Sequence, residues 1–80
     1  MNTKEAVANR IIELCKERHI AVYALAIDAG VPPGTVYSML NKKSLNPGIV
    51  NIKKLCDSFE ITLREFFSTP EFDALEQEIQ

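Results

Sequence analysis

Proline and glycine fall at three places in the chain and divide it into segments of helical length. Residues 30–34 have the sequence GVPPG, residues 46–48 have the sequence NPG, and Pro70 lies further on. Such residues interrupt regular secondary structure, and between them apolar residues recur every three to four positions, as in amphipathic helices. No segment sustains the alternation of apolar and polar residues that is typical of strands. The sequence therefore predicts an all-α protein.

Two of the expected helix starts carry a capping signal. Asn2 and Thr62 are each followed three residues later by a glutamate, which is the spacing of a capping box. Pro33 suits the first position of a helix, where its missing N–H is tolerated. Five helices are expected in residues 1–67, and an extra acidic C-terminal helix in residues 68–80. The expected spans are 3–18, 22–29, 33–41, 49–59, a short helix after the second capping box, and 70–78.

Chain length and charge limit the possible functions without selecting one. Eighty residues support one modest hydrophobic core, which excludes large enzyme architectures. The formal net charge of −2 is unevenly spread, because residues 1–67 carry nine basic and seven acidic residues, whereas residues 68–80 carry four acidic residues and no base. The body of the chain is therefore mildly basic and its C-terminal segment acidic.

Several classes of protein are excluded by motifs that the sequence lacks. The longest apolar run, residues 21–27, is far shorter than the ~20 residues that cross a bilayer, and the first ten residues do not form a signal peptide. A cytoplasmic protein without membrane contact is expected. Cys15 and Cys56 lie on apolar stripes and are expected in the core, and no zinc-site spacing, P-loop, HExxH or GxSxG motif occurs. We therefore expect no enzymatic activity, no metal, no cofactor and no small-molecule substrate.

One segment, VYALAIDAGVPPGTVYSMLN, has the spacing of two short helices packed across a tight turn. Ala26 is small enough for the second helix to cross the first, and Gly30 can adopt the positive φ that ends the first helix. Val31 fills the turn, and Val36 and Met39 anchor the inner face of the second helix. These offsets match a helix-turn-helix, whose second helix presents its outer face to the DNA major groove. The alternative is an ordinary αα-hairpin in a small helical bundle.

Together with the sequence around it, this segment resembles the helix-turn-helix of Cro and phage-repressor (XRE-type) transcriptional regulators. The resemblance covers about residues 10–67, with the motif at 22–41, and includes the Asn-Pro of residues 46–47 and the segments NIKKLC and ITLREFF. It implies a five-helix, lambda-repressor-like domain with an all-α fold. It also implies that the helix over residues 33–41 enters the major groove, usually from a symmetric dimer on a two-fold operator.

The same resemblance implies which residues contact double-stranded DNA. Many family members carry side-chain donors at the start of the recognition helix, whereas Pro33 and Gly34 have none, so base readout falls on the hydroxyl groups that follow. The residues implied to face bases are Pro33, Gly34, Tyr37 and Ser38, and those implied to contact phosphates are Val22, Thr35, Asn41, Lys42, Lys43 and Ser44.

Two functions remain open at this stage. The first is a sequence-specific transcriptional regulator, a repressor, that binds duplex DNA as a homodimer. The second is a protein-interaction module, such as an antagonist or an antitoxin-like partner, that has kept the fold with weakened DNA readout. The second is favoured by apolar or donor-free residues at positions 21, 22, 33 and 34 and by a sequence pI near 5.3.

The C-terminal segment also has two interpretations. Phe72, Leu75 and Ile79 are spaced to form one apolar stripe on a helix over residues 70–78. This stripe either pairs two subunits or packs back against the Phe66/Phe67 corner of its own domain.

Overall fold

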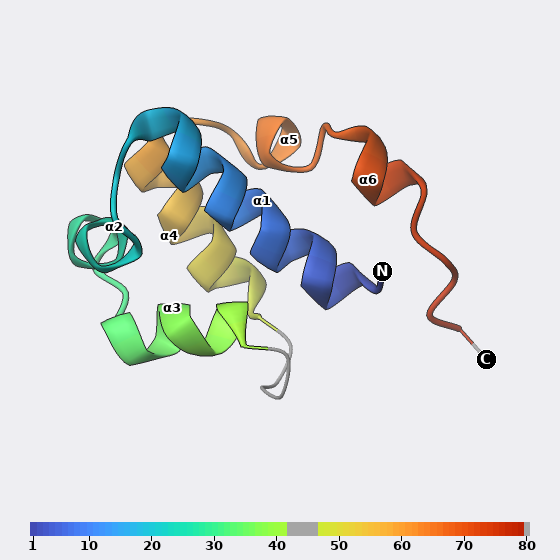
Figure 1. The fold of residues 1–80 in the computed structure, drawn as a ribbon, viewed down its shortest axis with the longest axis horizontal. Coiled ribbons are helices and arrows are strands. Elements are labelled where there is room, and N and C mark those ends of the chain that lie inside the picture. The colour runs from blue at the N-terminus through green and yellow to red at the C-terminus, as the bar shows by residue number, and fades with distance from the viewer. Residues whose placement is uncertain (42–46, 80) are drawn as a thin grey trace.

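A computed structural model describes residues 1–41 and 47–79, and in these ranges every regular element is a helix (Figure 1). This confirms the predicted all-α fold. The helices are α1 (Thr3–Arg18), α2 (Val22–Ala29), α3 (Pro33–Leu40), α4 (Ile49–Phe59), α5 (Leu63–Phe66) and α6 (Pro70–Asp73).

Two helix starts follow capping signals in the sequence, whereas two of the three left-handed helix ends lack the expected glycine. Asn2 and Thr62 each form a capping box, in which the side chain accepts a hydrogen bond from the backbone N–H of a glutamate three residues on. His19, Gly30 and Glu60 end α1, α2 and α4 in the left-handed conformation, with φ of 53°, 70° and 60°. Only one of these three positions carries the glycine that normally marks such an end.

The hydrophobic core lies where α1, α2, α3 and α4 meet. α2 packs against α3 and α4, and α1 packs against α2 and α3. Ala26, Val31, Val36 and Met39 are buried, as the sequence predicts. Ile49, in the first turn of α4, is 58% exposed, whereas Ile52 reaches the core. The buried apolar residues are Ala6, Val7, Ile11, Leu14, Cys15, Leu25, Ala26, Val31, Val36, Met39, Ile52, Leu55, Cys56, Phe59 and Phe66.

Two arginines of α1 tie the ends of α4 and α5 to the core. Arg10 donates hydrogen bonds to the backbone carbonyls of Glu65 and Phe66 at 3.1 and 2.8 Å. Arg18 donates to the carbonyl of Phe59 at 2.6 Å, and its guanidinium lies 5.9 Å from the centre of that residue's ring. The last carbonyls of a helix lack intrahelical partners, and these charge-assisted bonds provide one for Phe59 and Phe66. The Glu65 carbonyl also accepts hydrogen bonds from the backbone N–H and the hydroxyl of Ser68.

The predicted helix over residues 70–78 is wrong in its extent. α6 is a single turn, and Thr69 provides no side-chain cap for it. Phe72 packs edge-on against Phe67, with ring centres 4.9 Å apart, which places this part of the segment against its own domain. The predicted apolar stripe does not form, because the chain beyond Ala74 is not helical and Ile79 is 87% exposed.

A contact joins the C-terminal segment beyond α6 to the start of α1. The Glu78 carboxylate accepts hydrogen bonds from the Thr3 hydroxyl at 2.8 Å and from the Thr3 backbone N–H at 3.2 Å. That N–H belongs to the first turn of α1, where backbone donors are unpaired and the helix dipole favours a negative charge. The contact therefore holds the C-terminal segment, beyond the single uncapped turn of α6, against the start of α1.

Candidate nucleic-acid interface

The turn between α2 and α3 has the geometry that the sequence predicts. The backbone N–H of Gly30 donates hydrogen bonds to the carbonyls of Ala26 and Ile27. The backbone N–H of Val31 donates a hydrogen bond to the carbonyl of Ala26 at 3.0 Å. Ala26 is fully buried, and Val31 is 2% exposed beneath the turn. The small side chain and the left-handed glycine therefore let α3 pack closely against α2.

α3 has a buried inner face and an exposed outer face. Val36 and Met39 belong to the core, whereas Gly34, Tyr37 and Ser38 are exposed, with Tyr37 at 51%. Tyr37 and Ser38 lie three and four positions after Gly34, so both neighbour it on the helix surface. In Figure 1, α3 forms the lower edge of the molecule, with α4 and α1 above it in the view.

The remaining expected contact residues lie around α3 or outside the described ranges. Pro33 and Thr35 are partly buried in the first turn of α3, and Val22 is partly buried at the start of α2. Asn41 is exposed and caps the C-terminal end of α3. Its backbone N–H donates a hydrogen bond to the carbonyl of Ser38. Lys42, Lys43 and Ser44 lie outside the described residues.

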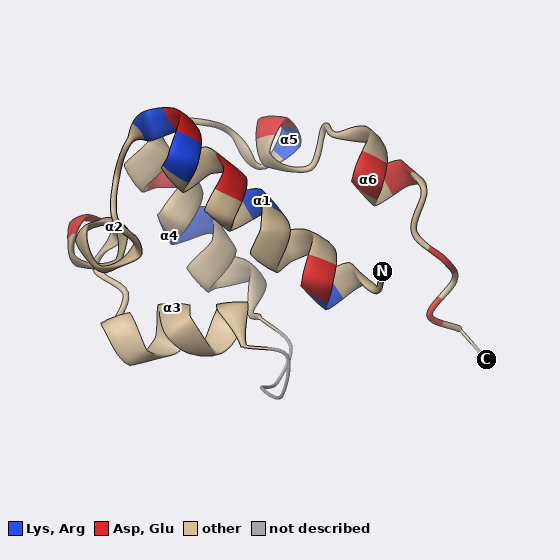
Figure 2. Cartoon of the chain, in the orientation of Figure 1, with Lys and Arg blue, Asp and Glu red and all other residues tan. Residues whose placement is uncertain are grey.

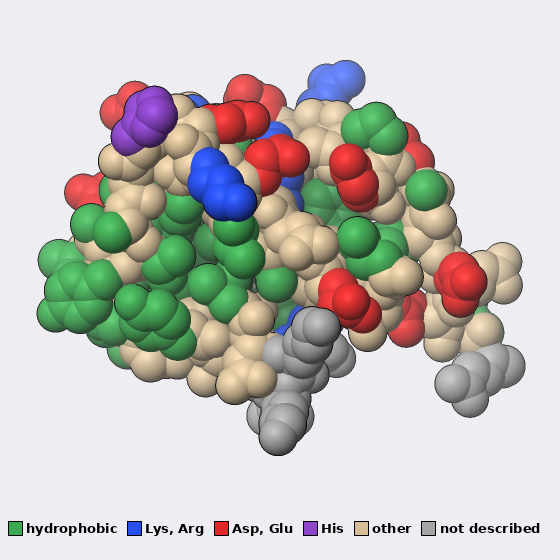
Figure 3. Space-filling model, viewed as in Figure 1, with side chains coloured by type: hydrophobic (Ala, Val, Ile, Leu, Met, Phe, Trp, Pro, Cys, Tyr) green, Lys and Arg blue, Asp and Glu red, His purple; other side chains and the backbone are tan. Residues whose placement is uncertain are grey.

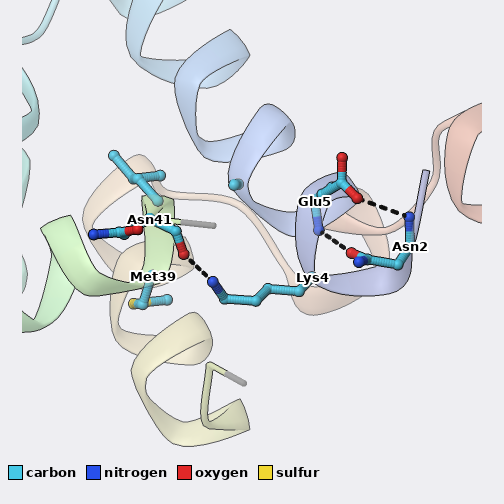
Figure 4. A pocket seen from close by; sticks show the side chains of 7 residues that line it. Asn2, Lys4, Glu5, Met39 and Asn41 are labelled. Carbon is cyan, nitrogen blue, oxygen red and sulfur yellow. Dashed lines mark hydrogen bonds between the residues drawn. The ribbon is translucent and has the colours of Figure 1, made fainter. Parts of the chain in front are cut away.

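Lys4 is a basic residue near this surface that sequence reasoning missed. Its ammonium donates a hydrogen bond to the backbone carbonyl of Asn41, which joins the start of α1 to the end of α3 (Figure 4). The two residues are 37 positions apart, and no motif in the sequence links them. A pocket of about 210 Å³ opens beside this bond, between Met39 at the end of α3 and Glu5 in the first turn of α1.

The two helices of the motif carry almost no charge. Asp28 is the single charged residue between positions 22 and 41, and its carboxylate accepts a hydrogen bond from the Ser58 hydroxyl of α4 (Figure 2). Tyr23 and Ile27 of α2 are 57% and 59% exposed. Hydrophobic side chains gather at the α2 end of the molecule, on the left in Figure 3. The outer face of the motif therefore offers hydroxyl groups, an amide and apolar surface, but no guanidinium or ammonium group.

The cysteines lie in the core, and the described residues contain no group of acidic, cysteine and histidine side chains that could hold a metal ion. Burial raises the pKa of the Cys15 and Cys56 thiols above their ordinary value, so both are protonated at neutral pH. Within the same described residues, no helix has the length and apolar content needed to cross a membrane.

The fold and the buried and exposed faces of α3 define a helix-turn-helix protein. The family described as the Cro/C1-type HTH DNA-binding domain matches residues 10–71, and the chain belongs to this family. Its structure is similar to one titled "Crystal structure of the prophage Lp1 protein 11", with a TM-score of 0.83 and 29% sequence identity. The matched region covers 94% of this chain and 100% of that chain. No curated protein matches the sequence.

Proposed function

We propose that the chain is a sequence-specific repressor of transcription that acts in the cytoplasm and binds duplex DNA as a homodimer. Residues 1–67 are its DNA-binding domain, and residues 68–80 are an acidic segment attached to it. The observation that carries this proposal is the division of α3 into a buried face at Val36 and Met39 and an exposed face at Gly34, Tyr37 and Ser38. A helix held in this way can enter the major groove without unfolding the core.

In the proposed complex, the base-facing residues are Pro33, Gly34, Tyr37 and Ser38. The phosphate contacts are Val22, Thr35 and Asn41, together with Lys42, Lys43 and Ser44 of the segment that follows. A homodimer suits this arrangement, because two copies related by a two-fold axis can occupy two half-sites about one helical turn apart.

A charge-removal experiment tests the proposal. The double variant Lys42→Ala/Lys43→Ala is expected to bind all duplexes more weakly, because each phosphate contact releases counterions. The slope of log K against log salt concentration should fall by up to about two, roughly one per lysine. The matched control is Lys53→Ala/Lys54→Ala, which removes the same charge from the exposed side of α4. Equal salt slopes for the two variants would contradict a phosphate-binding role for the pair after α3.

One observation favours the second candidate function, a protein-interaction module with the same fold. Tyr23, Ile27 and Tyr37 expose more than half of their surface on α2 and α3, and aromatic and apolar side chains are typical of protein interfaces. A binding assay over random duplexes at low and moderate salt separates the two functions. Absence of duplex binding even at low salt would favour the interaction module.

A further inference from the structure

The ammonium group of Lys4, a residue in the first turn of α1, lies at the C-terminal end of α3. It donates a hydrogen bond to the backbone carbonyl of Asn41, the residue that caps α3 (Figure 4). α3 has no basic residue in its own last turn. Lys4 therefore brings a positive charge to this end of α3 from another helix.

The charge of Lys4 is not paired with a carboxylate. Within the described part of the chain, no ion pair includes Lys4. The Glu5 carboxylate is turned toward Asn2, whose backbone N–H it accepts (Figure 4), and the Glu78 carboxylate accepts hydrogen bonds from Thr3. The partner of Lys4 is a neutral carbonyl, which takes one of the three donors of an ammonium group. The charge and two donors are left for an anionic ligand.

The length of α3 relates this charge to the backbone of bound DNA. Eight residues form a helix about 12 Å long, because the rise is ~1.5 Å per residue. The major groove is also about 12 Å wide. In helix-turn-helix complexes the N-terminal residues of the recognition helix contact base edges. With its start in the groove, α3 would bring its C-terminal end, and the Lys4 ammonium with it, to the phosphates that border the groove.

The surroundings of Lys4 leave room for a phosphate group. A pocket of about 210 Å³ is lined by Lys4 and Asn41, and Asn41 is exposed. The C-terminal end of a helix carries a partial negative charge, which repels an anion. An ammonium group at this end offsets that repulsion, so the end of α3 can accept a phosphate.

We propose that Lys4 binds a phosphate group of the DNA backbone at the C-terminal end of α3, with its ammonium held in place by the Asn41 carbonyl. This inference rests on the proposed function. It adds to the interface a contact from the start of α1, outside residues 10–71, which match the family. A phosphate contact carries no sequence information, so Lys4 strengthens binding to the operator and to unrelated duplexes alike.

The first test removes the charge of Lys4 in the full chain. Lys4→Gln is uncharged but keeps an N–H donor on a side chain of nearly the same length. Its affinity is measured for a duplex recovered by selection from a random pool and for an unrelated duplex. One lost phosphate contact lowers the slope of log K against log salt by about 0.9, so the fall in affinity between about 50 and 200 mM salt should become about 3.5-fold smaller for both duplexes.

Two variants serve as controls for this measurement. Lys16→Gln makes the same change on an exposed residue at the other end of α1, and it should keep the wild-type salt slope. Lys4→Arg keeps the charge and should also keep that slope. Thermal denaturation of each variant shows whether the fold is retained.

The second test locates the phosphate. Single phosphates of the recovered duplex are replaced in turn by methylphosphonates, which carry no charge. At one position in each half-site, the replacement should weaken binding of the wild type more than binding of Lys4→Gln, because the two partners of one contact are energetically coupled. At the other positions the two proteins should lose the same affinity.

The outcomes separate this contact from the proposed function. The contact is overturned if Lys4→Gln keeps the wild-type salt slope, if Lys16→Gln lowers the slope equally, or if the two proteins have the same methylphosphonate profile. In each of these cases the recovered duplex still binds, so the proposed function stands. Weaker binding of the recovered duplex alone, at an unchanged slope, also overturns the contact, because Lys4 then only positions α3. If no duplex is recovered, the proposed function fails, and the contact with it.

Discussion

Replacing Ala26 with leucine tests the close packing that creates the helix-turn-helix. Ala26 is fully buried in the middle of α2, and its carbonyl accepts the hydrogen bonds that close the turn at Gly30 and Val31. The substitution Ala26→Leu adds three carbon atoms at a point where α2 has α3 and α4 packed against it. Neither neighbour can move away without disturbing the core residues that it carries.

The expected loss of stability follows from this geometry. Insertion of extra carbon atoms into a well-packed core costs about 1–3 kcal/mol. For a domain of this size, each kcal/mol lowers the melting temperature by roughly 4–8 °C, so Ala26→Leu should melt about 4–24 °C below the wild type. Thermal denaturation followed by far-ultraviolet circular dichroism measures the shift directly, because the folded chain is helical throughout its regular elements.

The same helix provides a matched control. Ala24 is exposed on α2, so Ala24→Leu makes the identical chemical change where there is room for it. Surface substitutions of this kind change stability by at most about 0.5 kcal/mol. If the two leucine variants melt at the same temperature, then α2 and α3 do not cross closely at Ala26, and the packing argument is refuted.

Two further predictions concern the C-terminal segment. Phe72→Ala should destabilise the chain by roughly 2 kcal/mol, about half the cost of deleting a fully buried phenylalanine, because this half-buried ring packs on Phe67. Urea denaturation measures the loss. If Phe72→Ala and the control Ile79→Ala have the same denaturation midpoint, α6 does not pack against the domain. The Thr3 hydroxyl and, to a smaller extent, the Thr3 backbone N–H lower the pKa of Glu78, so its stabilising contribution is present above the ordinary glutamate pKa and is lost as pH falls through the folded value. The denaturation midpoints of the wild type and Glu78→Gln should therefore differ at pH 7 and converge as the pH falls below the lowered pKa of Glu78, whereas a pH-independent difference would contradict this contact.

Much of the fold could be predicted from the sequence because its signals are local. Proline, glycine and the two capping boxes set the helix starts, and the three-to-four-residue spacing of apolar side chains sets the buried faces. The expected span of α2 matches the structure, and α3 differs only in that Asn41 caps the helix. The offsets of Ala26 and Gly30 were informative for the same reason, since a tight turn depends on the size and backbone freedom of individual residues.

The features that could not be predicted depend on contacts between distant parts of the chain. The helical spacing of Phe72, Leu75 and Ile79 describes what the C-terminal segment can form alone, but the structure pairs Glu78 with Thr3, 75 residues away. The contact of Lys4 with the end of α3 has the same origin. No local pattern encodes which carboxylate reaches a helix N-terminus, because many exposed acidic residues compete for such positions.

The near absence of charge on α2 and α3 has a consequence for how quickly a DNA site is found. Positively charged surfaces draw proteins toward DNA at rates up to ~10⁹ M⁻¹s⁻¹, whereas association without such attraction proceeds at roughly 10⁵–10⁶ M⁻¹s⁻¹. The same attraction holds proteins on unrelated sequence and lets them slide along it. Two helices whose single charge is Asp28 contribute neither effect. Electrostatic attraction to DNA would therefore depend on residues outside the two helices, the proposed phosphate contacts Lys42 and Lys43 among them. The rate of association and the retention on unrelated sequence should both fall when these two lysines are replaced by alanine.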